Sequence, residues 1–194
     1  SILEVKPTIG QGATYLSEFN EGYVAGIPIL KFIGTNFPRK TKICKIEDGL
    51  VHFSEGITIP YQPMIGTIGV APRLEEESAS SGVLPGRHGG NMDLPDVCPK
   101  STVFLPIFHK GALLYVGDAH AVQGEGEISG TAVEMPAEVK VKVDLIRGEA
   151  TNWPRIETEG EVMFVATTRG GGSLEEAVRT AFLELIGWMG EKYA

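Results

Sequence analysis

Cysteine is scarce in this sequence of 194 residues, and the two that occur, Cys44 and Cys98, lack the density and spacing of a disulfide framework. Basic residues are also in deficit, because 25 acidic residues outweigh 17 basic ones and leave a formal net charge of −8. Such a chain has no basic field that would attract nucleic acid or anionic lipid. The composition therefore argues against a disulfide-rich secreted module and against nucleic acid as a partner.

Long hydrophobic segments are missing as well. The longest apolar run, YVAGIPILKFIG, is interrupted by glycine, proline and lysine well before it reaches membrane-spanning length. The N-terminal stretch SILEVKPTIG has neither a basic start nor a hydrophobic signal core. We therefore predict a protein of the reducing cytoplasm that has no membrane partner.

Glycine and proline, by contrast, are abundant, with 25 and 12 residues, and they separate short segments of β-forming residues. Asp48-Gly49 divides KICKIEDGLVHFS into two such segments, which is the pattern of a tight hairpin. Two more hairpins are predicted, one from TVFLPIF and ALLYVG and one from RIETEGEVMFVATT around Glu159-Gly160. Apolar and polar residues alternate through EVKVKVDLI, at 138–146, which predicts a half-buried strand.

One segment shows clear helical periodicity. Ser173 and Glu176 have the spacing of a capping box, and apolar residues then recur every three or four positions up to Met189. This pattern predicts a helix from about 173 to 189 with one apolar face buried, whereas the glycine, serine and proline of 73–96 predict a long loop. We expect a single region over 1–194 with a mainly β fold, an antiparallel sandwich or distorted barrel with a C-terminal helix packed on a sheet.

Polar residues gather in two glycine-rich stretches, RHGGNMD and GDAHAVQGEGEISGTAVE. Asp118 and His120 stand two residues apart just past the predicted strand ALLYVG, so in strand geometry both side chains point to the same face. His88 and Asp93 of the first stretch would complete a set of nitrogen and carboxylate ligands. Such a set suits zinc or another divalent transition ion better than calcium, which prefers oxygen. The alternative is a turn in which Asp118 bonds to backbone amides and His120 is solvated.

The remaining acids and histidines leave alternatives open. Glu125 and Glu127 alternate with glycines and can be solvated acids on a turn. Glu134 follows the apolar run ISGTAV, where a carboxyl can be a buried general base with a raised pKa or a surface group. His52 and His109 lie in or beside the predicted hairpins, and we expect them to be structural or exposed.

The stretches PMIGTIGVAP, GRHGGNMDLPD and GDAHAVQGEGEISGTAVE closely resemble the acetamidase/formamidase family. Its members carry an IGxxGVAP stretch, a GGNMD loop and a GDxHAxQGxGE loop that ends in T-A-[IV]-E. The resemblance implies hydrolysis of a short amide, such as formamide or acetamide, to ammonia and the carboxylate. It also implies a mainly β fold with a metal site, and a homodimer or higher homo-oligomer. γ-Lactam hydrolysis occurs among related activities and is one alternative, and a non-catalytic metal-binding β module is another.

The resemblance also assigns residues, position by position. Those expected to hold the metal, which would be zinc or else calcium, are Asp93, Asp118, His120 and, less firmly placed, His88. Those expected to move a proton or to orient the amide are Glu134, Glu127, Asn91 and Gln123. Typical members of the family are longer than this chain, so it can lack N- and C-terminal extensions that they carry.

Overall fold

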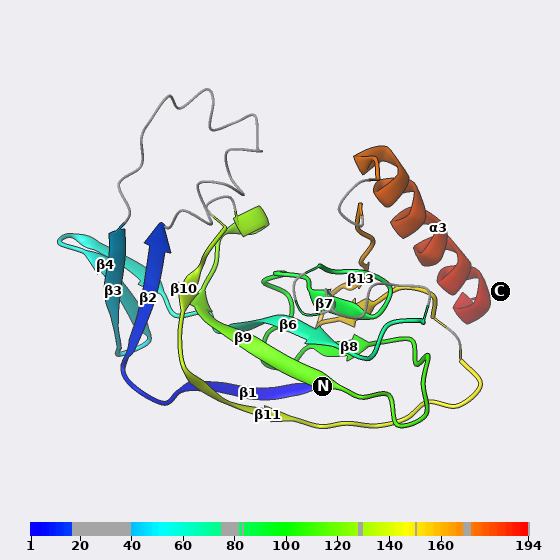
Figure 1. Cartoon of the computed structure of the whole chain (residues 1–194), viewed down its shortest axis with the longest axis horizontal. Helices are drawn as coiled ribbons and strands as arrows, with labels where there is room; N and C mark the ends of the chain where they lie inside the picture. The colour runs from blue at the N-terminus through cyan, green and yellow to red at the C-terminus, as the bar shows by residue number, and fades with distance from the viewer. Residues whose placement is uncertain are drawn as a thin grey trace.

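The structure is a computed structural model that describes residues 1–16, 40–74, 82, 84–127, 130–149, 151–168 and 172–193. It is mainly β, as the sequence predicts, with a long helix near its C-terminal end (Figure 1). The strands are β1 (Ile2–Pro7), β2 (Gln11–Leu16), β3 (Lys40–Glu47), β4 (Leu50–Ser54), β5 (Ile57–Pro60), β6 (Met64–Gly69), β7 (Gly89–Asn91), β8 (Thr102–Phe104), β9 (Tyr115–Val122), β10 (Val133–Glu134), β11 (Ala137–Val141), β12 (Arg155–Glu157) and β13 (Val162–Phe164). The helix α3 covers Leu174–Tyr193, and a 3-10 turn covers Glu125–Glu127.

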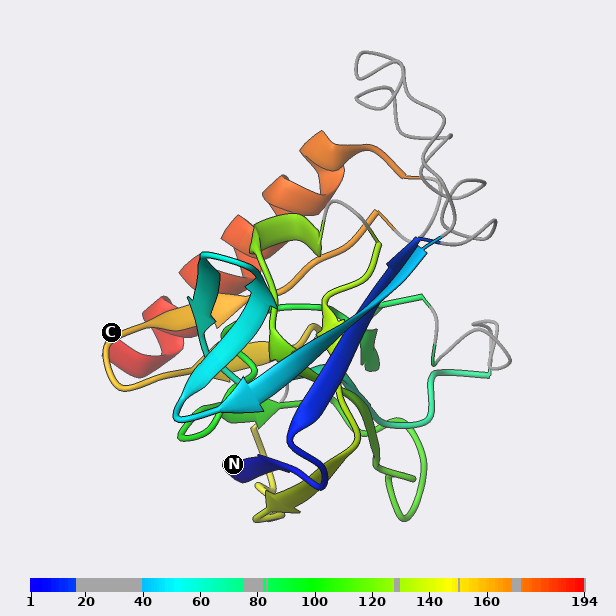
Figure 2. The same cartoon turned by 90° about the vertical axis from the view of Figure 1, so that its left-hand side faces the viewer.

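An eight-stranded antiparallel sheet dominates the fold, with the strands in the order β5-β4-β3-β2-β10-β9-β6-β7. The sheet is curled, because β6 and β9 run across the molecule whereas β2, β3 and β4 rise at an angle to them at one end (Figure 1). The paired strands β2 and β3 face the viewer in Figure 2. A second sheet pairs β1 with β11, and a third has the order β13-β12-β8. The predicted fold class is confirmed, and the curl gives the large sheet its distorted shape.

Membrane-crossing segments were not expected. Within the described ranges, no helix is both long enough and apolar enough to span a membrane. The apolar run at 23–34 lies outside the described residues.

Two of the three predicted hairpins are confirmed. Asp48 and Gly49 join β3 to β4, and their φ angles of 52° and 74° are the left-handed pair that a tight two-residue turn requires. In the second hairpin, β12 pairs with β13 so that Glu157 lies opposite Val162, and the turn contains Glu159-Gly160 as predicted. In both cases the turn residues and the flanking strands lie within one short segment, so the local sequence suffices to define the pairing.

The third predicted hairpin is wrong. β8 pairs with β12, whereas β9 pairs with β6 and β10, so TVFLPIF and ALLYVG belong to different sheets. Three consecutive residues between β8 and β9, at 111–113, have φ angles of 86°, 57° and 56°. This run of left-handed conformations does not return the chain antiparallel to β8 as a tight hairpin turn does.

Two further expectations are corrected. The strand predicted over 138–146 ends at Val141, and Val141 lies opposite Ile2 in the pairing of β11 with β1. The loop predicted over 73–96 contains the short strand β7, which pairs with β6. Gly89 of β7 has a φ of 88°, and a Cβ at this position would overlap the carbonyl oxygen of Ile68, so glycine permits the close pairing. Residues 75–81 and 83 of this loop lie outside the described residues.

The helix α3 begins where the capping box predicts. The backbone N–H of Glu176 donates a hydrogen bond of 3.1 Å to Oγ of Ser173, and this satisfies one of the free amides of the first turn. The helix continues to Tyr193, beyond the predicted end at 189.

Only part of the apolar face of α3 is buried. Trp188 packs on the three-stranded sheet, with its ring 6.4 Å from the ring of Phe164 in β13, and Ala177 is buried. Leu174 and Phe182, which the periodicity places on the buried face, are exposed on the described chain. The prediction of a wholly buried apolar face is therefore wrong, because the helix touches the three-stranded sheet along a narrow stripe.

The core of the protein is organised around β6. This strand is buried along its whole length and lies between β9 on one side and β7 on the other. Both of its edges are therefore hydrogen-bonded, and its position is fixed more firmly than that of an edge strand. Residues opposite β6 in β7 and β9 inherit this fixed geometry.

Replacing Ile65 of β6 by alanine tests this arrangement. Ile65 is 0% exposed, so Ile65→Ala should lower the free energy of unfolding by about 2–5 kcal/mol, as truncation of buried aliphatic side chains does. Ile57→Ala in β5 is the matched control, because Ile57 is 51% exposed and should cost less than about 1 kcal/mol. Urea unfolding of both variants measures the difference, and equal losses would contradict the central position of β6.

Candidate functional site

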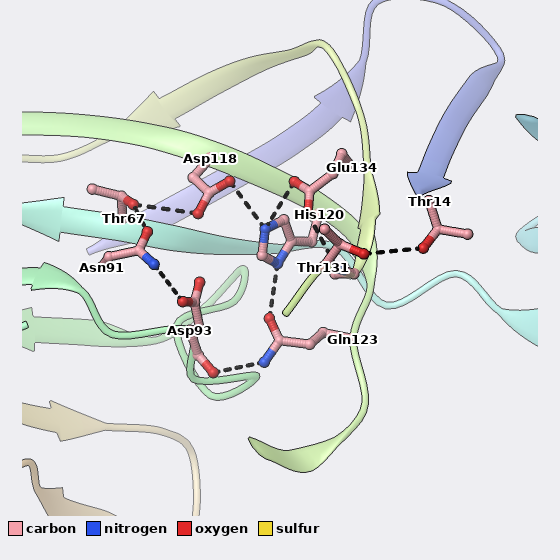
Figure 3. A network of polar contacts seen from close by, with 10 residues as sticks. Thr14, Thr67, Asn91, Asp93, Asp118, His120, Gln123, Thr131 and Glu134 are labelled. Carbon is pink, nitrogen blue, oxygen red and sulfur yellow. Dashed lines mark hydrogen bonds and ion pairs between the residues drawn. The ribbon is translucent and has the colours of Figure 1, made fainter. Parts of the chain in front are cut away.

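His120 is the centre of the candidate site, and the strand β9 carries it. Its side chain is 1% exposed, and Nε2 lies 3.1 Å from Oδ1 of Asp118 and 3.0 Å from Oε2 of Glu134 (Figure 3). The expectation that Asp118 and His120 share a face is confirmed. The glycine-rich stretch is less of a loop than its composition indicates, because β9 pairs with the buried strand β6 up to His120.

Strand pairing places Glu134 beside the imidazole. In the short strand β10, Glu134 lies opposite His120 of β9. Oε2 of Glu134 contacts the imidazole, and Oε1 accepts a hydrogen bond of 3.1 Å from the backbone N–H of Ala132. Both carboxylate oxygens therefore have partners, and the side chain is held in one orientation.

Gln123 determines which nitrogen of His120 faces the acids. Nδ1 of His120 lies 2.8 Å from Oε1 of Gln123, whose Nε2 donates to the backbone oxygen of Asp93 at 2.6 Å. Because a carbonyl oxygen only accepts, Nδ1 must carry a hydrogen. Nε2 is thus left facing the carboxylates, either protonated or with a lone pair free for a cation. Burial lowers the pKa of His120, but hydrogen bonds to Asp118 and Glu134 outweigh it and raise the pKa to about 10.

The GGNMD stretch is anchored on β6 and brings Asp93 to the site. The backbone N–H groups of Met92 and Asp93 both donate to the carbonyl oxygen of Gly66, at 3.0 and 3.1 Å. Nδ2 of Asn91 donates to Oδ2 of Asp93 at 2.5 Å, and Oδ1 of Asn91 accepts from the hydroxyl of Thr67. These bonds fix one oxygen of the Asp93 carboxyl against the strand.

The other oxygen of Asp93 has no such support. Among the described residues, Oδ1 of Asp93 is buried and has no hydrogen-bond partner. Burial, together with the negative charges of Glu127 and Asp118, raises the pKa of Asp93 to about 7. A buried polar atom without a partner is costly and calls for an explanation, of which a bound ion is one.

The absence of a side chain at Gly66 makes room for this oxygen. A Cβ on Gly66 would lie 2.5 Å from Oδ1 of Asp93 and closer still to Oδ2 of Asp118, so no larger residue fits without moving a carboxylate. The two carboxylates can therefore lie this close to the backbone of β6 because residue 66 has no side chain. No local pattern around Gly66 predicts this role, although Gly66 lies in the IGTIGVAP stretch that carries part of the family resemblance.

Two sets of side chains among the described residues could hold a metal ion. One is Asp93, Asp118 and His120, and the other is His120, Glu127 and Glu134, with the ligand atoms of each set within 4.8 Å of one another. The two stretches predicted to form one site are therefore brought together. His88 is buried but belongs to neither set.

Three acids of the site have unusual backbone conformations. The φ angles of Asp93, Asp118 and Glu127 are 48°, 60° and 41°, in the left-handed region that residues other than glycine rarely adopt. Each such residue costs on the order of 1 kcal/mol or more and persists only where surrounding contacts impose it. The sheet and the anchored GGNMD stretch supply those contacts for Asp118 and Asp93, whereas Glu127 lies on the 3-10 turn.

The other residues considered in the sequence lie as expected. His52 is exposed in β4, and Nε2 of His109 lies 2.7 Å from the carbonyl oxygen of Pro72, so both are exposed or structural. Glu125 is exposed on the 3-10 turn. Cys44 is buried in the core, and neither of the two sets contains a cysteine.

Comparison with known proteins agrees with these motifs. The profile of the Acetamidase/Formamidase family matches residues 73–187, which is more than half of the chain. The acetamidase of Mycolicibacterium smegmatis is 43% identical over 67 residues, and the formamidase of Methylophilus methylotrophus is 41% identical over 66 residues. Each alignment covers 34% of this chain and 16% of the relative.

The fold is also similar to that of a longer protein. The crystal structure of an acetamidase from Bacillus halodurans superposes with a TM-score of 0.83 at 33% identity, over 100% of this chain and 60% of that one. The chain thus spans less than two thirds of the length of these relatives. All five candidate ligands, from Asp93 to Glu134, lie within the residues that the profile matches. The chain belongs to the acetamidase/formamidase family.

Proposed function

We propose that this chain hydrolyses a short-chain amide, with formamide or acetamide as the substrate class, to ammonia and the carboxylate, and that a divalent metal assists. One observation carries the proposal: the ligand atoms of Asp93, Asp118 and His120 lie within 4.8 Å of one another, and the buried Oδ1 of Asp93 has no hydrogen-bond partner among the described residues. The names of the acetamidase and formamidase relatives support an amide as the substrate.

The donor set fits a transition ion. Zinc accepts both imidazole nitrogen and carboxylate oxygen as ligands, whereas calcium takes six to eight oxygen ligands. Gln123 keeps the hydrogen of His120 on Nδ1, so that Nε2 can serve as a ligand when it is deprotonated. A divalent ion held here would supply positive charge that polarises an amide carbonyl and makes water more acidic.

The two glutamates take different parts in the proposal. Both oxygens of Glu134 are engaged, with His120 and with the backbone of Ala132, so we assign Glu134 to hold the imidazole and to contact the substrate. Glu127 lies on the 3-10 turn at the rim of the site, with a carboxylate oxygen within 4.8 Å of the ligand atoms of His120 and Glu134. We assign it to carry a proton to the departing ammonia, because an amide anion is a poor leaving group.

Asn91 and Gln123 act in the proposal through other residues. The family resemblance implies that both orient the substrate carboxamide. Their side-chain amides are already bonded, Asn91 to Asp93 and Thr67, and Gln123 to His120 and the backbone of Asp93. We therefore assign them to position Asp93 and His120. Zinc as the ion, a homo-oligomeric assembly, a cytoplasmic location and γ-lactam hydrolysis stay predictions.

An ammonia-release assay with formamide, acetamide, propionamide and a γ-lactam, run beside elemental analysis, tests the proposal. His120→Gln keeps similar volume and a hydrogen-bond donor but removes the ring nitrogens. It should lower the bound metal and reduce kcat/KM on the order of 100-fold or more, since even residues that only support a ligand are worth about 10–100-fold. His52→Gln, at an exposed position in β4, is the matched control and should match the unchanged protein.

Two results would count against this proposal. Full activity and metal content in the His120→Gln protein would remove His120 from the mechanism. Bound metal without turnover of any substrate would favour the non-catalytic binding module.

Gly66→Ala tests whether the space that Gly66 leaves for the two carboxylates is needed for metal binding. The added Cβ would displace Asp93 or Asp118, so the affinity for zinc, measured by calorimetry, should fall about tenfold or more. Gly117→Ala in the neighbouring strand β9 is the control, because a Cβ there meets no atom within 4 Å. Equal zinc affinities in the two variants would show that Gly66 is not needed to shape the site.

A further inference from the structure

A pocket of about 420 Å³ opens beside the candidate site. Asp118 and Glu134 form part of its wall, and Ile9, Ala13 and Ile43 contribute apolar side chains to the rest. The apolar residues come from β2, β3 and the turn before β2, which lie outside the residues matched by the family profile. A mostly apolar pocket that ends on a few polar groups is the usual form of a small-molecule site.

The register of the strands explains how these residues meet. Ile43 of β3 lies opposite Ala13 of β2, Ala13 lies opposite Glu134 of β10, and Glu134 lies opposite His120 of β9. Directly opposed residues of an antiparallel sheet put their side chains on the same face, with Cα atoms about 4.5–5.5 Å apart. A continuous row of side chains therefore leads from the buried imidazole through one carboxylate to two apolar residues.

The opposite face of the same strands belongs to the core. Gly12 and Cys44, which alternate with Ala13 and Ile43, form the next pair in the register, and Cys44 is 0% exposed. Ile43, by contrast, is 61% exposed, so the row that contains Ala13 and Ile43 faces solvent beside the site. Ile43 thus contributes an exposed apolar side chain to the pocket that Asp118 and Glu134 also line.

The chemistry of an amide matches this layout. If the carbonyl oxygen and the amino group face the polar cluster around His120, the substituent on the carbonyl carbon remains to be accommodated. In formamide this substituent is a hydrogen atom, whereas in acetamide and propionamide it is a methyl or an ethyl group. Burial of each methylene in an apolar pocket favours binding about fourfold.

We propose that the pocket receives the acyl substituent of the substrate and that Ala13 limits the size of that substituent. The preferred substrates are then aliphatic amides with an apolar acyl group, with propionamide and acetamide ahead of formamide. This inference rests on the proposed amide hydrolysis and specifies its substrate class. Ala13 is the position with most influence, because it stands directly next to Glu134 and has the smallest side chain in the row.

The experiment compares kcat/KM for formamide, acetamide and propionamide in four proteins. The unchanged protein should gain about fourfold per added carbon. Ala13→Val keeps a side chain that suits a strand but fills the pocket, and it should lower the ratio of propionamide to formamide about tenfold. Ile43→Ala, at an exposed position that tolerates truncation, removes a wall and should lower the same ratio about fourfold.

Ile57→Ala is the matched control, because Ile57 is also an exposed isoleucine of the large sheet but does not line the pocket. It should leave the ratio unchanged. Two results would refute the acyl pocket while leaving amide hydrolysis in place. In the first, the unchanged protein hydrolyses amides but Ala13→Val and Ile43→Ala keep the propionamide-to-formamide ratio of the control. In the second, formamide is the best substrate. If the unchanged protein hydrolyses no amide, both the proposed function and the acyl pocket are refuted.

Discussion

The contacts of the buried His120 imidazole connect every part of the candidate site. Nε2 meets the carboxylates of Asp118 and Glu134, and Nδ1 meets the amide of Gln123, which in turn holds the backbone of Asp93. Four acids converge within a small, partly desolvated volume, where like charges repel more strongly than in water. The imidazole offsets this repulsion, either as a hydrogen-bond donor to the carboxylates or as a ligand of a cation.

The large sheet supplies the rigidity that this arrangement needs. β6 is buried between two strands, and its backbone carbonyl at Gly66 fixes the GGNMD stretch, while Glu134 of β10 lies directly opposite His120 of β9. Sites built on strands hold their groups more precisely than sites built on loops. This rigidity also explains how Asp93 and Asp118 can be kept in left-handed backbone conformations, which a loose loop would relax.

The acidic site and the pocket beside it come from different parts of the chain. The acids belong to residues 93–134, within the part that the family profile matches, whereas Ala13 and Ile43 belong to strands that precede it. The pairing of β2 with β10 joins these two parts. A division of this kind lets the chemistry and the selectivity of a site vary independently, because substitutions in β2 or β3 change the residues that line the pocket while the acidic residues stay the same.

The sequence by itself determined the features that depend on neighbouring residues. These are the hairpin turn at Asp48-Gly49 and the helix start at Ser173. Only the tertiary structure decided which distant strands pair, and with that the burial of His120 and its contact with Glu134. It also revealed that Gly66 leaves space for two carboxylates and that Ala13 stands beside Glu134. These features arise when segments far apart in the sequence are brought together, and local propensity carries no information about such pairings.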